Sequence, residues 1–320
     1  MAVKDLIKLQ IGQEATWGAG AVATAKLMGV TDISLDIVDT VHQSEALNGT
    51  LYPSDLVALA EQHGEGSFSM DLSYDDILYP LDGLFEEETP TGGPAYVWTY
   101  IAPTTAVLSS NNYCFEIGGT GAEYECLGAT PTGMTISGEA GGVWTAEVPF
   151  FSKAVDDASM TGLSDRTVEL IRMSDTVLAI DAWGGTIGTT TVSNELIAFT
   201  LSFDTGRHLK QFNASLAPSS YGETKWTGTL DLTMEYSTTT KAIVDAMSGA
   251  TLQQRLIRLT ATSGADIVQI DFAGTLANGV SLFSDRDGNL TADLSFTGTY
   301  SDTGTEWLEF TVTNSIDALT

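Results

Sequence analysis

GVWTAEVPF (residues 142–150) and GNLTADLSF (residues 288–296) are two versions of one pattern in this chain. Both have Gly, Thr, Ala and Phe at the same places, and both alternate apolar with polar or acidic side chains. Such alternation places one set of side chains on a core face and the other set in water or against a neighbour. The pair predicts two similar β-strands and raises the question of whether half of the chain is repeated.

The same alternation recurs along the whole chain. The clearest other runs are DISLDIV (32–38), SFSMDLS (67–73) and AFTLSF (198–203). Turn signals such as GTGAE, ATSGAD and SDTGTE separate the runs at the spacing expected of a sandwich or barrel. The sequence therefore predicts a mainly β fold with antiparallel strands.

Helical patterns are scarce. SDLVALAEQHG (54–64) has a Ser or Asp cap candidate and a closing Gly, which predicts a short helix. YDDILYPLDGLF (74–85) and YSTTTKAIVDAMSG (236–249) each follow an alternating strand and indicate two further helices. Pro80 should restrict the helix within 74–85 to a short or bent one.

Further matches in the same order favour a duplication of the chain. They are DLIKL (5–9) with ELIRM (169–173), Ile33, Leu35 and Ile37 with Ile197, Phe199 and Leu201, MDLS (70–73) with LDLT (230–233), and GMTI (133–136) with GVSL (279–282). An all-β chain can produce one such match by chance, but collinear matches with a helix in register point to a repeated unit. We predict two tandem β-sandwich domains, residues 1–160 and 161–320, each with a flanking α-helix and a long inter-strand loop.

The two long inter-strand segments begin at histidines that lie at nearly equivalent points of the two halves. HQSEALNGTLYPSDLVALAEQHG begins at His42, and HLKQFNASLAPSSYG begins at His208. We expect both segments to be extended loops with contacts of their own.

The charge of the chain argues against ordinary nucleic-acid binding. Its 320 residues include 13 Lys and Arg against 42 Asp and Glu, a formal charge of −29 that repels phosphates. The acidic residues give either a solvated surface that aids solubility or a wall past which another polyanion slides without binding. Composition alone leaves both interpretations open.

The N-terminal stretch carries charges at Lys4, Asp5 and Lys8 and does not resemble a secretory signal. No stretch approaches the roughly 20 apolar residues that span a bilayer. We therefore expect a soluble chain that is made in the cytoplasm and has no membrane partner. Two cysteines, Cys114 and Cys126, make no disulfide framework, and free thiols are expected, although pairing stays open.

The sequence assigns no catalytic, cofactor-binding or metal-binding residue. His42, His63 and His208 are the available histidine bases, and none lies in a hydrolase motif such as GxSxG. DRDGN (285–289) resembles the start of an EF-hand loop but lacks the later acidic ligand, which favours a simple turn. A glycosidase with paired carboxylates stays open because acidic residues are too many to single out one pair.

The stretch IGQEATWGAGAVATAKLMGVTDISLDI (11–37) resembles the start of tail tube proteins of long-tailed bacteriophages. Glu14, Thr16, Trp17 and Gly18 carry the likeness, as the Glu-x-Thr-x-Gly element that follows the first strand in that family. GEGSFSMDLSYDDILYPLDGLF (64–85) adds a Gly-led strand that runs into a helix. Where the family often has Gly-Thr after the aromatic residue, this chain has Gly18-Ala19.

The resemblance implies a structural protein of the virion tail, with no enzyme activity and no cofactor. It implies subunits whose sheets join into rings and whose long loops stack the rings into a tube. Viral double-stranded DNA would pass through an acidic lumen without specific binding, and a tape measure protein and a tail terminator would be further partners. If single-domain members form rings of six, a chain with two domains should form a homotrimer with pseudo-sixfold symmetry.

Two other classes of function remain as alternatives. One is a different virion structural protein, such as a capsid decoration or baseplate component, which would bind a capsid or hub without forming long tubes. The other is a carbohydrate-active β-protein, which would be indicated by a secretory signal and by binding to glycans.

Overall fold

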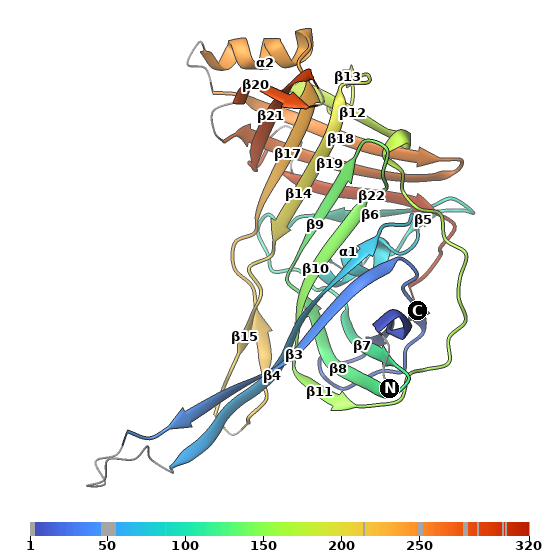
Figure 1. Cartoon of the computed structure of the whole chain (residues 1–320), viewed down its shortest axis with the longest axis vertical. Helices are drawn as coiled ribbons and strands as arrows, with labels where there is room; N and C mark the ends of the chain where they lie inside the picture. Colours follow the sequence, from blue (N-terminus) through green and yellow to red (C-terminus); the bar gives the residue numbers. More distant parts are fainter. Residues whose placement is uncertain are drawn as a thin grey trace.

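Antiparallel strands in two layers make up most of the computed structural model, which describes residues 4–45, 56–86, 88–213, 215–248, 252–277, 281–286, 288–302, 304 and 306–319 (Figure 1). The strands before residue 160 are β1 (Lys8–Glu14), β2 (Ala25–Lys26), β3 (Val30–Gln43), β4 (Val57–Asp71), β5 (Thr91–Gly92), β6 (Tyr96–Ile101), β7 (Asn112–Gly119), β8 (Ala122–Pro131), β9 (Gly133–Glu139), β10 (Thr145–Ser152) and β11 (Ala154–Asp157). Those after it are β12 (Thr176–Ala182), β13 (Thr191–Val192), β14 (Leu196–Asp204), β15 (His208–Lys210), β16 (Ser220–Gly222), β17 (Thr227–Glu235), β18 (Gln254–Ser263), β19 (Asp266–Leu276), β20 (Ser281–Arg286), β21 (Asn289–Gly298) and β22 (Leu308–Asn314). The helices are η1 (Lys4–Leu6), α1 (Leu78–Leu84), η2 (Met173–Asp175) and α2 (Thr238–Ser248).

One long antiparallel sheet runs through both halves of the chain. Its strands follow the order β3-β4-β10-β9-β14-β17-β21-β20. The first four strands come from the first half and the last four from the second. The two halves are therefore joined edge to edge by the ladder between β9 and β14.

A second layer packs on the core side of this long sheet in each half. It has the order β2-β1-β7-β8-β11 in the first half and β13-β12-β18-β19-β22 in the second. β6 and β5 come from the first half of the sequence, yet β6 pairs with β22 and extends the layer of the second half. The first half thus contributes a hairpin to the second layer of the other half, and the two halves also share a sheet.

Aromatic side chains fill the space between the layers. In the first half Phe115 of β7 contacts Phe150 of β10, with ring centroids 5.1 Å apart. At the junction of the halves Phe85, which follows α1, packs against Phe310 at 5.6 Å and Trp226 at 5.1 Å. Contacts of this kind add about 0.5–1.5 kcal/mol each to the burial of the rings. One core therefore continues from the first half into the second.

The order of strand pairing is the same in both halves, and the two halves share one irregularity. β3 has a bulge between Val30 and Asp32 where it pairs with β4, and β14 has one between Leu196 and Ala198 where it pairs with β17. Bulges interrupt a ladder at defined positions, so a shared one is a specific likeness. β10 lies beside β4 and forms a hairpin with β9, as β21 lies beside β17 and forms a hairpin with β20.

The pairings correct three of the sequence matches. Ala146 of β10 faces Met70, and Ala292 of β21 faces Met234, so FSMD (68–71) corresponds to LTME (232–235) rather than MDLS to LDLT. In the same scheme Ile33 corresponds to Phe199, two residues beyond the match made from the sequence. ELIRM precedes β12, and the strand that corresponds to β1 begins at Thr176. Period-two patterns keep their parity under shifts of two or four residues, which explains the errors near Met70 and Ile33.

The helix predicted over 54–64 is wrong for its described part, because Val57 and the residues after it form β4. Val57 pairs with Gln43, and this hairpin partner outweighs the helix propensity of Ala, Leu and Glu. The predictions for 74–85 and 236–249 are confirmed by α1 and α2. Pro80 lies in the first turn of α1, where its missing N–H has no helical partner to lose.

Candidate functional site

The solvent side of the long sheet, here called the polar face, is made of hydroxyl and acidic side chains. Along β10 the side chains of Ala146, Val148 and Phe150 are buried in the core, while Thr145 and Glu147 are exposed. β9, β14 and β17 alternate in the same way, so the two sides of the sheet differ sharply in chemistry. The two strands that first drew attention in the sequence thus each contribute one row to this face.

Carboxylates are the dominant charge on the polar face. They are Asp32, Asp36, Glu65, Asp71, Glu139, Glu147, Asp204, Asp231, Glu235 and Asp293. Lys4 lies 2.6 Å from Asp32, and its hydrogen bond and charge lower the pKa of that carboxyl. Arg286 of β20 pairs with Glu139. The face as a whole repels a polyanion at neutral pH.

Hydroxyl pairs tie the neighbouring strands together across this face. Ser34 and Ser67 lie 3.0 Å apart between β3 and β4, and Ser137 and Thr145 lie 3.0 Å apart between β9 and β10. At the junction of the halves the hydroxyls of Thr135 and Ser202 also lie 3.0 Å apart. Side chains that satisfy one another across strands leave few donors for a passing ligand.

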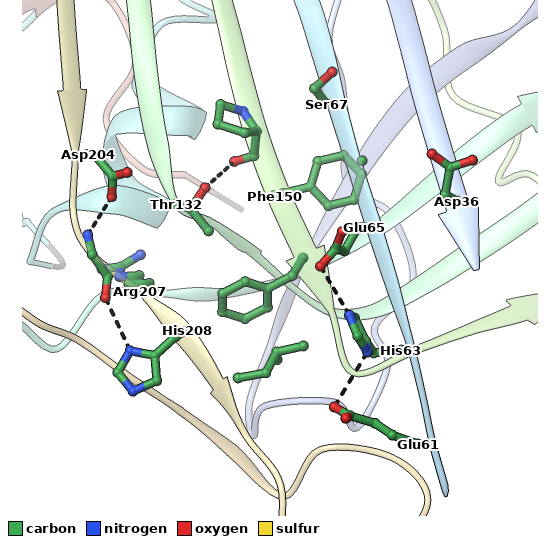
Figure 2. Close-up of a pocket in the computed structure, with 15 residues that line it drawn as sticks. Asp36, Glu61, His63, Glu65, Ser67, Thr132, Phe150, Asp204, Arg207 and His208 are labelled. Carbon is green, nitrogen blue, oxygen red and sulfur yellow. Dashed lines mark hydrogen bonds and ion pairs between the residues drawn. The ribbon is translucent and has the colours of Figure 1, made fainter. Parts of the chain in front are cut away.

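A groove of about 740 Å³ opens where residues 205–213 and 215–226, here called the second excursion, leave the polar face (Figure 2). His63 lies on its wall, with Nδ1 3.6 Å from Glu61 and Nε2 3.1 Å from Glu65. Both ring nitrogens thus face carboxylates of their own strand rather than a hydroxyl nucleophile. His208 lines the same groove, and its Nδ1 lies 3.2 Å from the Gly206 carbonyl oxygen.

Arg207, on the opposite wall of the groove, is fully buried and anchors the second excursion. Its guanidinium donates to the carbonyl oxygens of Gly83 at 2.6 Å and Leu84 at 2.7 Å, at the end of α1. It also donates to Glu223 at 3.3 Å, whose side chain is 3% exposed. Satisfied donors offset the cost of burying this charge. No sequence motif points to this residue, because most of its hydrogen-bond partners lie far from it along the chain.

The second excursion lies against the first half of the chain. The backbone N–H of Gln62 in β4 donates to the Leu216 carbonyl oxygen at 3.0 Å. Tyr221 of β16 packs against Trp17 at 5.7 Å and Phe151 at 6.1 Å. The expectation that this segment makes contacts of its own is therefore confirmed, and those contacts lie on the opposite half.

The Glu14 element holds the glycine-rich loop that follows β1. The buried carboxylate of Glu14 accepts hydrogen bonds from the backbone N–H groups of Gly18 at 2.6 Å, Gly20 at 3.0 Å and Gly128 at 2.9 Å. Trp17 Nε1 donates to the Gly128 carbonyl oxygen at 2.9 Å. The likeness quoted from the sequence thus rests on residues that fix a loop.

The second half holds a loop in a similar way, through a carboxylate that no expectation from the sequence included. Asp181, near the end of β12, accepts hydrogen bonds from the backbone N–H groups of Gly188, Thr189 and Thr190 at 2.7–3.1 Å. EATWG (14–18) and DAWG (181–184) are the matching signals, and Gly18 and Gly184 both have positive φ, +73° and +83°. Gly adopts this conformation at no steric cost.

The remaining residues considered from the sequence are two cysteines, His42 and the DRDGN segment. Cys114 and Cys126 are buried and free, and burial raises the pKa of both thiols. His42 is exposed on β3. Of DRDGN (285–289), Asp285 and Arg286 end β20 and Asn289 begins β21, and the Gly288 N–H donates to Asp285 at 2.8 Å, while Asp287 lies outside the described residues. Within the described ranges, no group of three or more His, Cys, Asp or Glu side chains could hold a metal ion.

A family model described as phage tail tube protein matches residues 5–298. The match covers the loop element, the long sheet and nearly all of the second layer. A search among curated proteins finds no match. No helix in the described part of the chain is long and apolar enough to cross a membrane.

Proposed function

The chain belongs to the phage tail tube protein family, and from that membership we propose that three copies close one ring of a tail tube. The protein is a structural subunit of the phage tail and lies in the virion, where members of the family assemble into tube rings. Our proposal concerns the number of chains in a ring, the wall of the channel and the partners at the tube ends.

The ladder between β9 and β14 carries the proposal. It joins two units of the same strand order by seven residue pairs, from Ala198↔Glu139 to Asp204↔Gly133. In the described part of the chain β20 pairs with β21 alone and β3 with β4 alone. β20 corresponds to β9, and β3 corresponds to β14. The same junction can therefore form between two chains, which also removes two open sheet edges.

Repetition of this junction favours three chains with two units each over six chains. We infer that residues 1–160 and 161–320 descend from one duplicated unit, and that the β5–β6 hairpin of the first pairs with the layer of the second. Six units would then surround the channel. The corresponding bulges and loop elements support this inference.

The polar face is the proposed channel wall. Its carboxylates repel the phosphates of viral DNA, so the genome would pass without being held. The paired hydroxyls leave a wall that is wetted but offers few free donors. In this proposal the acidic residues serve the passage of DNA and not only the solubility of the protein. A tape measure protein inside the tube and a terminator at its end are the further partners proposed.

Electron microscopy and native mass spectrometry of the purified protein test the ring. Rings of three chains with six similar lobes are expected, and rings of six chains would overturn the proposal. The junction predicts that Ser281 of one chain lies opposite Asp36 of the next, as Thr135 lies opposite Ser202 within the chain. Asp36→Cys with Ser281→Cys should therefore yield covalent trimers on oxidation. The single variants serve as controls and should stay uncrosslinked.

A further inference from the structure

We propose that the arm of one chain docks into a groove on the second half of the neighbouring chain in the ring. The arm is the described end of the β3–β4 hairpin, residues 37–45 and 56–62, which projects from the body of the molecule (Figure 1). The groove is lined by residues 103–107, 223–228 and 298–300 and by Trp307. The inference rests on the proposed ring and names a contact that ring closure alone does not specify.

The groove is large and largely apolar at its base. Its volume is about 780 Å³, and the nearly buried rings of Trp226 and Trp307 form part of its lining. Val107 and Tyr300 on its rim are 71% and 46% exposed. Exposed apolar surface next to buried aromatic rings is typical of a site that a partner covers.

The corresponding position on the first half is occupied within the chain itself. Gln62 and His63 of β4 correspond to Trp226 and Thr227 at the start of β17, by the pairing scheme that equates Met70 with Met234. The second excursion fills this position, where the Leu216 carbonyl oxygen accepts from the Gln62 N–H. A cavity of about 150 Å³, lined by Leu216 and Ala217, lies beside this contact, and His63 also lines the groove of about 740 Å³ described above.

The direction of the excursions identifies the occupant. The second excursion leaves β14, which pairs with β9, and lies back over the half that contains β9. If β3 pairs with β20 of a neighbour in the same way, the arm leaving β3 lies over the neighbour's second half. That half contains the vacant groove. Both excursions therefore follow one rule. Each lies over the half whose edge strand pairs with the strand that the excursion leaves.

The chemistry of the arm suits this groove. Five of its apolar side chains are 40–57% exposed: Ile37, Val41, Leu56, Val57 and Leu59. The arm also carries acidic residues, among them Asp39 and Glu61, and the groove is lined by Lys225. Apolar contact with an ionic contact at the rim is the usual anatomy of a specific interface.

Photo-crosslinking in assembled rings tests the contact directly. A photoreactive amino acid in place of Val41 should crosslink to peptides containing 103–107, 223–228 or 298–300. Mixing isotope-labelled and unlabelled protein before assembly should show that these crosslinks join different chains. Rings that crosslink from Val41 to other segments would overturn the docking proposal alone. A wild-type chain that forms no rings would overturn the proposed function instead.

A pair of matched variants supplies a second readout. Val107→Asp places a charge on the groove rim, next to the acidic arm, and should weaken assembly about tenfold or more without lowering the melting temperature. Val22→Asp is the control, since Val22 is 74% exposed and lies outside both arm and groove. Equal assembly of both variants would contradict the proposal. Val41→Asp on the arm should reproduce the loss seen with Val107→Asp.

Discussion

The two excursions leave corresponding strands, β3 and β14, and differ in their surroundings. The first is the projecting arm, whereas the second lies against the first half of the chain. Arg207 in the second is 6% exposed and bound to the end of α1, whereas the corresponding residue of the first, Val41, is 57% exposed on a projecting hairpin. The strands of the long sheet pair in the same order in both halves, whereas the contacts made by one excursion have almost no counterpart in the other. Assembly contacts are therefore best sought in the excursions, where the two halves differ.

The difference also separates two physical strategies. The second excursion is fixed inside the chain by a buried charge whose hydrogen bonds all depend on the fold. The first exposes apolar side chains to water, and their burial by a partner would be favourable. One excursion is thus complete in the single chain, and the other is completed by a neighbour.

The largest effect on this comparison is expected from Arg207→Met. The variant removes the anchor of the second excursion and leaves Glu223 buried without its cation. Loss of one partner of a buried ion pair costs about 3–5 kcal/mol. Urea unfolding monitored by tryptophan fluorescence should show this loss in the free energy of unfolding.

Arg172→Met is the matched control for that measurement. Arg172 also pairs with a carboxylate, Asp175 at 2.8 Å, but its side chain is 55% exposed. Exposed pairs contribute about 0–1 kcal/mol, so this variant should unfold almost as wild type does. A cost for Arg207→Met no larger than that of the control would show that the second excursion is held by other contacts.

An intermediate effect is expected where the two halves agree. Glu14→Gln and Asp181→Asn each replace a carboxylate that accepts several backbone N–H groups by an amide whose NH₂ cannot accept. Each should lower the free energy of unfolding by about 1–3 kcal/mol. Chemical denaturation of the two variants side by side checks the equivalence. A cost at Glu14 with none at Asp181 would separate the family motif from its apparent copy.

The last effect depends on pH and concerns Glu306, a titrating group of the second half. Burial, together with a hydrogen bond to Glu309 and its charge, raises the pKa of Glu306 from 4.5 to about 8. Between these values the unfolded chain releases the proton that the folded chain keeps, so this group lowers stability as pH rises from about 4.5 to about 8. Its slope should stay below the roughly 1.4 kcal/mol per pH unit of one full proton.

Glu306→Gln removes that titration and provides the test. Thermal unfolding between pH 5 and pH 8 should show the variant gaining stability relative to wild type as pH rises. A difference between the two proteins that is constant with pH would contradict the assignment of a raised pKa to Glu306. Asp302→Asn, a change at an exposed carboxyl of the same loop, controls for general charge effects.

Local patterns in the sequence determined the class of fold, the flanking helices and the family. Alternation fixes which side chains of a strand are buried, so the rows through Ala146 and Ala292 could be assigned to a core face in advance. The EATWG element was readable because all of its residues lie within one loop. Alternation cannot fix register, since a slip of two or four residues preserves the buried side, and the matches near Met70 and Ile33 failed for that reason.

The tertiary structure alone decided how the two halves meet. The ladder between β9 and β14, the β5–β6 hairpin on β22 and the anchor at Arg207 all join segments that are far apart in the sequence. Residues 57–64 form a strand because a hairpin partner was available, although their composition favours a helix. Short-range preferences are written in neighbouring residues, whereas these contacts depend on which surfaces the folded strands bring together.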